Sequence, residues 1–229
     1  MNMQAPTGEA DFWNPEFAYE HRDDGTIVMR QTGALPEHLP TLADYLDTWA
    51  DATPDRTWIA RRGRDGEWIR ISYAEARDRA RRIGASLLAM GLGADRPLLI
   101  LSGNSLEHAL LGAACFYTGI PYAPITPAYS LVSKDHAKLK DIAGNLQPGA
   151  LFVDDGQAYE AALSAIAADG RQVIARENPG AGAAMFDDLL AGDPADAMPA
   201  RQAVGAETVV KYLFTSGSTG APKAVINTN

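Results

Sequence analysis

The sequence is poor in three features that would each define a class of protein. It holds a single cysteine, Cys115, so no disulfide can form within the chain. No stretch approaches the roughly 18 consecutive apolar residues that a membrane-spanning helix needs. Residues 1–17 join no basic start to an apolar run, so they do not predict a secretory signal. We therefore expect a cytoplasmic protein without a membrane partner.

Clustered positive charge is also scarce. The formal net charge is −9, from 20 Lys and Arg against 29 Asp and Glu. Binding to a phosphate backbone needs grouped basic residues, so the balance argues against nucleic acid as a partner. The two short basic groups, 61–64 and 77–82, are interpreted as solvated faces. In the second group, Glu75 is four residues before Arg79, a spacing that predicts an ion pair along a helix.

Regular structure is expected to begin near residue 41. Residues 1–40 are rich in proline and glycine and predict an irregular lead-in, with a short strand at 26–30. Thr41 can cap a helix whose apolar residues recur at helical spacing. The residues expected on its buried face are Leu42, Tyr45, Leu46 and Trp49.

Strands and helices are then expected to alternate. A hairpin is predicted from the runs 57–60 and 68–71, followed by a capping box at Ser72–Glu75 that opens a long helix. Further strands are expected at 97–101, 120–125, 150–153, 171–175 and 208–214, and further helices at 105–117, 135–145, 157–168 and 187–190. Residues 176–206 read as mostly loop. This alternation predicts an α/β fold with a largely parallel sheet flanked by helices.

The most informative segment follows the last expected strand. It reads Thr215-Ser-Gly-Ser-Thr-Gly-Ala-Pro-Lys223. Its glycines let the backbone approach an anion closely, and successive N–H groups in such a turn form an anion site. Four hydroxyls add hydrogen-bond donors, and Lys223 adds a positive charge. The segment therefore predicts a cradle for a triphosphate. The residues expected to bind the phosphates are Thr215, Ser216, Gly217, Ser218, Thr219, Gly220 and Lys223.

Other phosphate motifs do not fit this segment. A Walker A loop has two glycines five apart and opens a helix, whereas Gly217 and Gly220 are three apart and the run after Lys223 is strand-like. The dinucleotide motif Gly-x-Gly-x-x-Gly is absent. A Ser/Gly-rich surface turn is the alternative, but the complete string after a β run is rare by chance. We expect a loop that joins two strands of a hairpin.

The segment from Tyr212 to Lys223 resembles the phosphate-loop signature of the superfamily of acyl-CoA synthetases, firefly luciferase and peptide-synthetase adenylation domains. The resemblance covers about residues 38–229. Four upstream strings look most like feruloyl-CoA synthases: 104–108, 119–124, 127–131 and 134–139. The superfamily commonly has glycine after the loop lysine, where this chain has Ala224.

The resemblance implies an ATP-dependent acid–CoA ligase. Such enzymes use Mg-ATP to turn a carboxylic acid into an acyl-adenylate, and coenzyme A then displaces AMP. Residues 41–229 would form an incomplete AMP-binding domain, the N-terminal part of the large domain, that ends just after the phosphate loop. We expect such a piece to be inactive alone, with no residue assigned a catalytic role. The alternatives are a non-catalytic nucleotide- or phosphate-binding module, a gene fragment without function of its own, and a ligase for another aryl or fatty acid.

The remaining reactive side chains predict no site. Cys115 lies among small apolar residues and is expected to be buried and inert. His108 and His136 stand alone, without the spacing of metal ligands, and are expected to be structural or surface residues.

Overall fold

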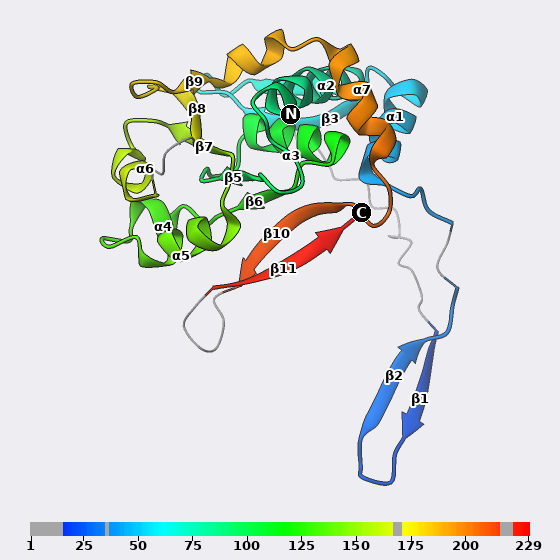
Figure 1. Cartoon of the computed structure of the whole chain (residues 1–229). Coiled ribbons are helices and arrows are strands. Elements are labelled where there is room, and N and C mark those ends of the chain that lie inside the picture. The colour runs from blue at the N-terminus through cyan, green and yellow to red at the C-terminus, as the bar shows by residue number, and fades with distance from the viewer. Residues whose placement is uncertain (1–15, 35–36, 167–170, 216–221) are drawn as a thin grey trace. The chain divides into compact units, whose positions relative to one another are not determined.

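The computed structural model describes residues 16–34, 37–166, 171–215 and 222–229. The chain divides into two compact units, 1–38 and 39–229, and each is described by itself (Figure 1). The second unit contains all the elements that bear on function.

The first unit contains an antiparallel hairpin of β1 (Phe17–His21) and β2 (Ile27–Gln31). The expected strand at 26–30 is present as β2, but β1 was not expected, so the lead-in is more regular than its composition indicates. Gly25 has a φ of +84° in the turn, a conformation that glycine adopts at little cost.

The second unit is built on a mostly parallel sheet of seven strands in the order β11-β10-β6-β5-β7-β8-β9. Every neighbouring pair is parallel except β10 and β11, which are antiparallel. The strands are β5 (Leu98–Ile100), β6 (Tyr122–Pro124), β7 (Ala150–Asp155), β8 (Gln172–Glu177), β9 (Ala184–Met185), β10 (Val209–Thr215) and β11 (Lys223–Thr228). A separate hairpin pairs β3 (Thr57–Arg62) with β4 (Trp68–Ser72). The expected α/β fold with a largely parallel sheet is confirmed.

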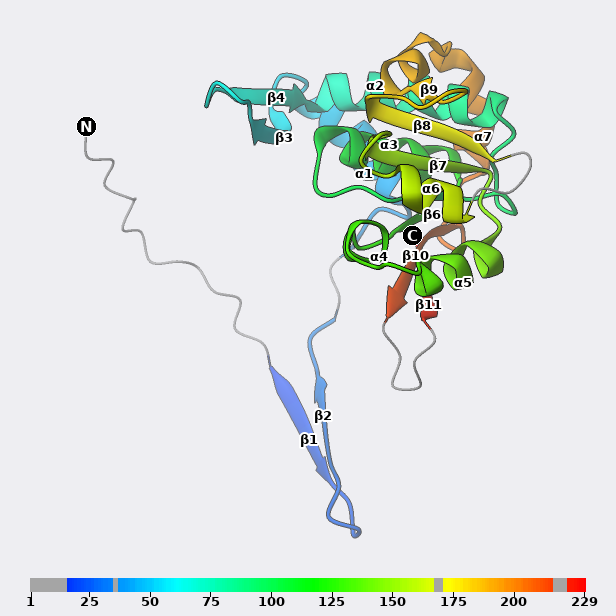
Figure 2. The ribbon, with the colours of Figure 1, turned by 90° about the vertical axis from the view of Figure 1, so that its left-hand side faces the viewer.

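Helices cover both faces of this sheet (Figures 1 and 2). They are α1 (Leu42–Ala52), α2 (Tyr73–Ala89), α3 (Leu106–Thr118), α4 (Ala128–Leu131), α5 (Ala137–Leu146), α6 (Glu160–Ile166) and α7 (Met198–Ala203), with the 3₁₀ turns η1 (Phe186–Ala191) and η2 (Pro194–Ala197). Within the described residues, no helix is long and apolar enough to cross a membrane.

The alternation of side chains along β5 separates two hydrophobic cores. Leu98 and Ile100 join the cluster that packs under α1, α2 and α3. Leu99 points the other way, into the cluster that packs under α5 and α6. Because successive side chains of a strand point to opposite faces, a strand buried on both sides must be apolar throughout. This requirement explains the uninterrupted run from 98 to 101.

The helix caps expected at Thr41 and Ser72 are present. Ser72 accepts from the Glu75 amide at 3.2 Å and the Glu75 carboxylate accepts from the Ser72 amide at 2.8 Å, which completes the capping box of α2. Ser105 caps α3, and Gly119 ends it with a φ of +68°. Cys115 is fully buried in α3, as expected, and burial raises the pKa of its thiol.

Helix α1 is rotated relative to the expected orientation. Its buried residues are Ala43, Leu46 and Ala50, whereas Leu42, Tyr45 and Trp49 are 48%, 39% and 40% exposed. The cause lies outside the helix. Its aspartates face arginines of α2 and α7, as described below, and those ion pairs fix which side of α1 faces inward.

Three other expectations are corrected. Residues 176–206 contain β9, η1, η2 and α7 and are not mostly loop, although the short helix expected at 187–190 is present as η1. The segment after β6 contains the short helix α4. The basic group on α2 is only partly solvated, since the Arg81 side chain is 28% exposed and bonds inward, although the expected Glu75–Arg79 pair is present at 3.8 Å.

Candidate active site

The β10–β11 hairpin carries the segment that the sequence singled out. Thr215 ends β10 and Lys223 begins β11, and the two residues are directly paired across the hairpin. The Thr215 hydroxyl lies 3.4 Å from the Lys223 carbonyl oxygen, and both residues are exposed. The expected placement of the segment between two antiparallel strands is therefore correct, and the Walker A geometry of a loop that opens a helix is ruled out.

Five of the predicted phosphate-binding residues lie outside the described residues. They are Ser216, Gly217, Ser218, Thr219 and Gly220. Their contact with phosphate stays a prediction, as does that of Thr215 and Lys223.

Thr215 and Lys223, which we call the tip of the hairpin, lie at the carboxyl edge of the sheet. β10 pairs in parallel with β6 at Lys211↔Tyr122, so Thr215 lies on the same side as the carboxyl ends of β5, β6, β7 and β8. In open α/β sheets, ligands bind outside the carboxyl ends of the strands. The position of the tip thus suits a binding loop.

A group of charged side chains lies at the same edge. Asp154 is at the end of β7, Arg176 is at the end of β8, and Glu107 is in the first turn of α3. Arg176 Nη1 is 3.9 Å from Glu107 Oε2 and 4.0 Å from Asp154 Oδ1. These separations exceed a direct hydrogen bond. We call these three residues the edge cluster.

The edge cluster contains polar atoms without partners. Among the described residues, four buried side-chain atoms lack a hydrogen-bond partner: Glu107 Oε2, Ser130 Oγ, Asp154 Oδ1 and Arg176 Nε. Ser130 follows β6 in α4, so all four atoms belong to segments at or just after a carboxyl end. Buried polar atoms are nearly always paired in folded proteins. The buried polar atoms without partners are thus concentrated at the carboxyl edge of the sheet.

Some polar atoms at this edge do have hydrogen-bond partners. Asp154 Oδ2 accepts from the Gly103 amide at 2.9 Å. Asp155 accepts from the amides of Gln157 and Ala158, and hydrogen bonds from the Ala158 amide and the Asn178 side chain lower the pKa of its exposed carboxyl. Burial and the nearby Asp154 carboxylate raise the pKa of the Tyr159 hydroxyl.

The two histidines play local roles. His108 Nδ1 lies 3.0 Å from Ser102 Oγ and 3.1 Å from the Gly103 carbonyl oxygen, so the ring steadies the turn after β5. His136 precedes α5 with a φ of +51°, and its Nδ1 lies 3.2 Å from the Tyr129 carbonyl oxygen. In the part of the chain that the structure describes, no group of three or more His, Cys, Asp and Glu residues could hold a metal ion.

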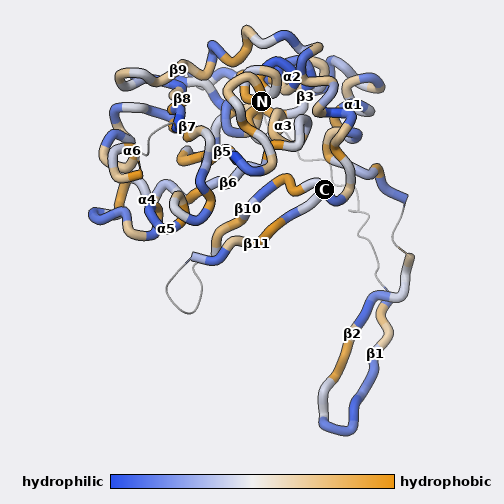
Figure 3. The backbone as a smooth tube through the Cα atoms, in the orientation of Figure 1, coloured by the Kyte–Doolittle hydropathy of each residue, from blue (hydrophilic) through white to orange (hydrophobic). Residues whose placement is uncertain are grey.

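A groove of about 400 Å³ runs along one face of the hairpin. Its lining includes Tyr212, Phe214 and Ala224 of the hairpin, together with Asp95 and Asn145. The hydropathy colouring of Figure 3 shows apolar residues in β11, where Val225 and Ile226 are 49% and 64% exposed. The hairpin is thus less covered than the other strands of the sheet.

The edge cluster was not predicted from the sequence. Its members come from three elements that are distant in the sequence and adjacent only in the fold. One signal was available, namely a charged residue directly after each of the buried runs that became β7 and β8.

Comparison with known proteins agrees with this geometry. Residues 46–229 match the family model described as AMP-binding enzyme, so the chain belongs to that family, the adenylate-forming superfamily. The match includes the whole sheet and the hairpin with Thr215 and Lys223.

Two curated relatives illustrate the range of the family. The chain is 27% identical over 190 residues to an indoleacetate–CoA ligase of Aromatoleum aromaticum, covering 81% of this chain and 34% of that protein. It is 28% identical over 188 residues to a probable non-canonical nonribosomal peptide synthetase, CymA, of Salinispora arenicola, covering 82% of this chain and 2% of that protein. The chain therefore spans about a third or less of the length of these relatives.

Solved structures share the fold. An acetoacetyl-CoA synthetase from Streptomyces lividans superposes with a TM-score of 0.67 at 20% identity, over 82% of this chain and 30% of that one. McyG A-PCP in complex with phenylalanyl-adenylate gives 0.65 at 24% identity, over 86% of this chain and 34% of that one. At these identities the likeness shows the fold alone.

Proposed function

We propose that this chain supplies the triphosphate-binding part of an ATP-dependent acid–CoA ligase. The observation that carries the proposal is the placement of Thr215 and Lys223 at the facing ends of an antiparallel pair, at the carboxyl edge of the sheet, in a chain of the AMP-binding enzyme family. Segment 215–223 would hold the β- and γ-phosphates of Mg-ATP. Magnesium would enter with the nucleotide, because protein sites commonly bind it through substrate phosphates.

The reaction has two steps. A carboxylate oxygen of the acid attacks the α-phosphorus of ATP, the bond to the β-phosphate oxygen breaks, and pyrophosphate leaves. The sulfur of coenzyme A then attacks the acyl carbon, AMP leaves, and the thiol proton passes to solvent. Lys223 and the hydroxyls of the segment would stabilise the negative charge that develops on the departing pyrophosphate.

For the acid, we propose ferulate or a related cinnamic acid. The support is the resemblance of 104–108, 119–124, 127–131 and 134–139 to feruloyl-CoA synthases. Indoleacetate, the aryl acid in the name of one relative, is the natural competitor.

Lysine substitutions on the hairpin test the nucleotide proposal. We expect Lys223→Met to raise the dissociation constant for Mg-ATP about tenfold, since a hydrogen bond to a charged group contributes roughly 1.5–3 kcal/mol. Lys211→Met, on the same hairpin but away from the tip, is the matched control and should change it less than about twofold. Isothermal titration of each purified chain gives the constants. Equal binding by both variants and the unchanged protein would refute the proposed role of the loop.

Exchange of labelled pyrophosphate into ATP separates a ligase from a binding module. We propose that the 229-residue chain binds Mg-ATP without acid-dependent exchange. Exchange with ferulate, in excess of that with indoleacetate, would contradict the inactivity and support the acid assignment. Exchange that favours indoleacetate would contradict both.

A further inference from the structure

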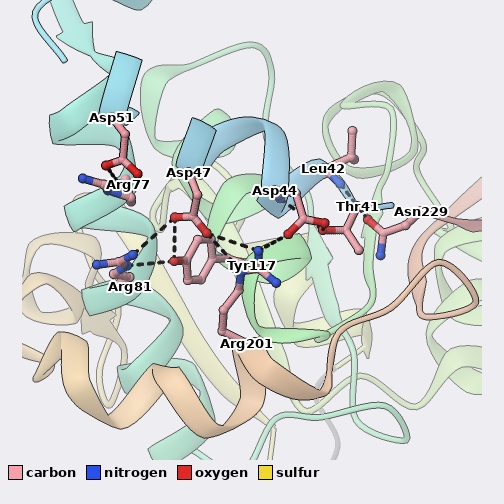
Figure 4. A network of polar contacts seen from close by, with 10 residues as sticks. All are labelled: Thr41, Leu42, Asp44, Asp47, Asp51, Arg77, Arg81, Tyr117, Arg201 and Asn229. Atoms are coloured by element: carbon pink, nitrogen blue, oxygen red, sulfur yellow. Dashed lines mark hydrogen bonds and ion pairs between the residues drawn. The ribbon is translucent and has the colours of Figure 1, made fainter. Parts of the chain in front are cut away.

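The side-chain amide of Asn229 joins two distant parts of the chain, and Figure 4 shows its contact with Leu42. Its Oδ1 accepts a hydrogen bond from the Leu42 backbone amide at 3.1 Å. Its Nδ2 donates to the Gly205 carbonyl oxygen, also at 3.1 Å. Leu42 is the first residue of α1, where the backbone N–H has no partner within the helix. Asn229 therefore completes the start of α1 and binds the turn before β10 at the same time.

That turn is itself closed. The Thr208 amide donates to the Gly205 carbonyl oxygen at 3.0 Å, and the Gly205 amide donates to the Thr208 hydroxyl at 2.9 Å. The next residue, Val209, opens β10 and pairs with Thr228 of β11. Val209 and Thr228 form the end of the hairpin opposite to the tip, and we call this end the root. Asn229 therefore attaches the root to α1 and to the turn.

A second attachment reaches the same helix through α7, the element before the turn. Arg201 of α7 donates from Nε and Nη2 to Asp47 Oδ2, at 3.3 and 3.2 Å, and its Nη2 also donates to Asp44 Oδ1 (Figure 4). The Arg201 side chain is 13% exposed. Helix α1 therefore contacts the chain on both sequence sides of the hairpin. Arg201 makes the contact before the turn, and Asn229 makes it after β11.

The tip has fewer strand partners than the root. Among the described residues, β10 meets β6 at one register position, Lys211↔Tyr122. From Tyr212 to Thr215, β10 pairs only with β11 among the residues that the structure describes. Tyr212 and Phe214 also pack against the core cluster under α5 and α6, and the attachment at the root adds to this packing in setting the direction of the hairpin.

We propose that Asn229 and Arg201 are positioning residues that aim the tip, Thr215 and Lys223, an inference that rests on the proposed function. A strand rises about 3.3 Å per residue, so the tip lies about 20 Å from the root. At that distance, a tilt of about 3° at the root displaces the tip by about 1 Å. A misplacement of about 1 Å can cost about a hundredfold in an enzymatic reaction.

The test compares Asn229→Ala with Thr228→Ser, a matched change at the exposed neighbouring position. Amide hydrogen exchange is measured on the whole chain without nucleotide, and Mg-ATP binding by titration. We expect Asn229→Ala to speed exchange about tenfold in β10 and β11, to leave β5 and β7 unchanged, and to raise the dissociation constant about tenfold. Thr228→Ser should alter none of these by more than about twofold. Arg201→Lys, which keeps the charge but loses the planar fork, should act in the same direction more weakly.

The outcomes separate the two proposals. Exchange that is equally slow in Asn229→Ala and Thr228→Ser overturns the positioning role. Faster exchange throughout the sheet also overturns it, because it indicates a loss of general stability. If the unchanged chain does not bind Mg-ATP while the hairpin responds to Asn229→Ala, the root attachment stands and the nucleotide function fails. If Asn229→Ala binds Mg-ATP as tightly as the unchanged chain, positioning fails and the nucleotide function stands.

Discussion

Two groups of arginines and carboxylates in this molecule are similarly buried but differently bonded. In the helical layer, Asp47 Oδ1 accepts from the Tyr117 hydroxyl at 2.9 Å and from Arg81 at 3.2 Å (Figure 4). In the edge cluster, the charged atoms of Arg176 and its partners Glu107 and Asp154 stay 3.9–4.0 Å apart. The Asp47 and Asp154 side chains are 25% and 20% exposed, so burial does not explain the difference.

The two regions differ in whether their buried polar atoms have hydrogen-bond partners. Around Asp47, Tyr117 contributes both bonding and packing, since its fully buried ring lies 5.4 Å from the Arg81 guanidinium and 5.2 Å from that of Arg201. The edge cluster contains unpartnered buried atoms, at the end of the sheet where ligands bind in α/β folds. Places where a fold leaves polar groups unsatisfied are often its functional places.

The largest effect is expected from Asp47→Asn. Asparagine offers one acceptor oxygen where Asp47 receives bonds from Tyr117, Arg81 and Arg201, and its amide would meet guanidinium donors. We expect the free energy of unfolding to fall by about 2 kcal/mol, as when a partly buried ion pair loses one partner. Urea denaturation at pH 7, followed by circular dichroism, gives the value.

Asp51→Asn is the control for this change. It alters the same helix and also removes a carboxylate that bonds an arginine, Arg77, but the Asp51 side chain is 72% exposed. A surface pair contributes about 0.5 kcal/mol or less. Similar losses in the two variants would show that the buried network contributes no more than a surface pair.

A smaller, pH-dependent effect is expected at Asp44. Burial alone would raise the pKa of its carboxyl, but hydrogen bonds from Arg201 and Thr41 outweigh burial and hold the pKa below its ordinary 3.8. A carboxyl with a lowered pKa stabilises the fold above the ordinary pKa and loses that contribution as the pH falls through the folded-state pKa. The stability gap between the unchanged chain and Asp44→Asn should therefore narrow from about pH 6 to about pH 3. Denaturant titrations across this range measure the gap, and a constant gap would exclude the Asp44 ion pair as its source.

The sequence predicted elements whose determinants are local. The capping box at Ser72 and Glu75 acts within a few residues, and the start of α2 was predicted correctly. The alternation of apolar strands and helices was enough to predict the parallel sheet, because it reflects burial on both faces.

The features that the sequence did not predict depend on contacts between residues that are distant in the chain. The orientation of α1 depends on Arg201, which is 154 residues from Asp47, and no local periodicity encodes that contact. The short elements η2 and α7 depend on packing against α2 and α3, so their Ala-containing sequence reads as loop. At the candidate site, the sequence was enough to predict that Thr215 and Lys223 lie in a hairpin. The edge cluster could not be predicted, because it forms only when three separate segments meet.

The smallest effect is expected from Glu107→Gln, the same acid-to-amide change made at the edge. Glu107 lies 4.0 Å from Arg61 and 3.9 Å from Arg176, and its Oε2 has no partner. Removing the charge relieves the cost of burying an unpaired carboxylate oxygen. It also removes a favourable interaction with the start of α3, worth about 0.3–1 kcal/mol. These terms oppose each other, so the unfolding free energy should change by less than about 0.5 kcal/mol. A loss as large as that of Asp47→Asn would mean that the edge cluster is a satisfied ion network, and the contrast between the two regions would then be wrong.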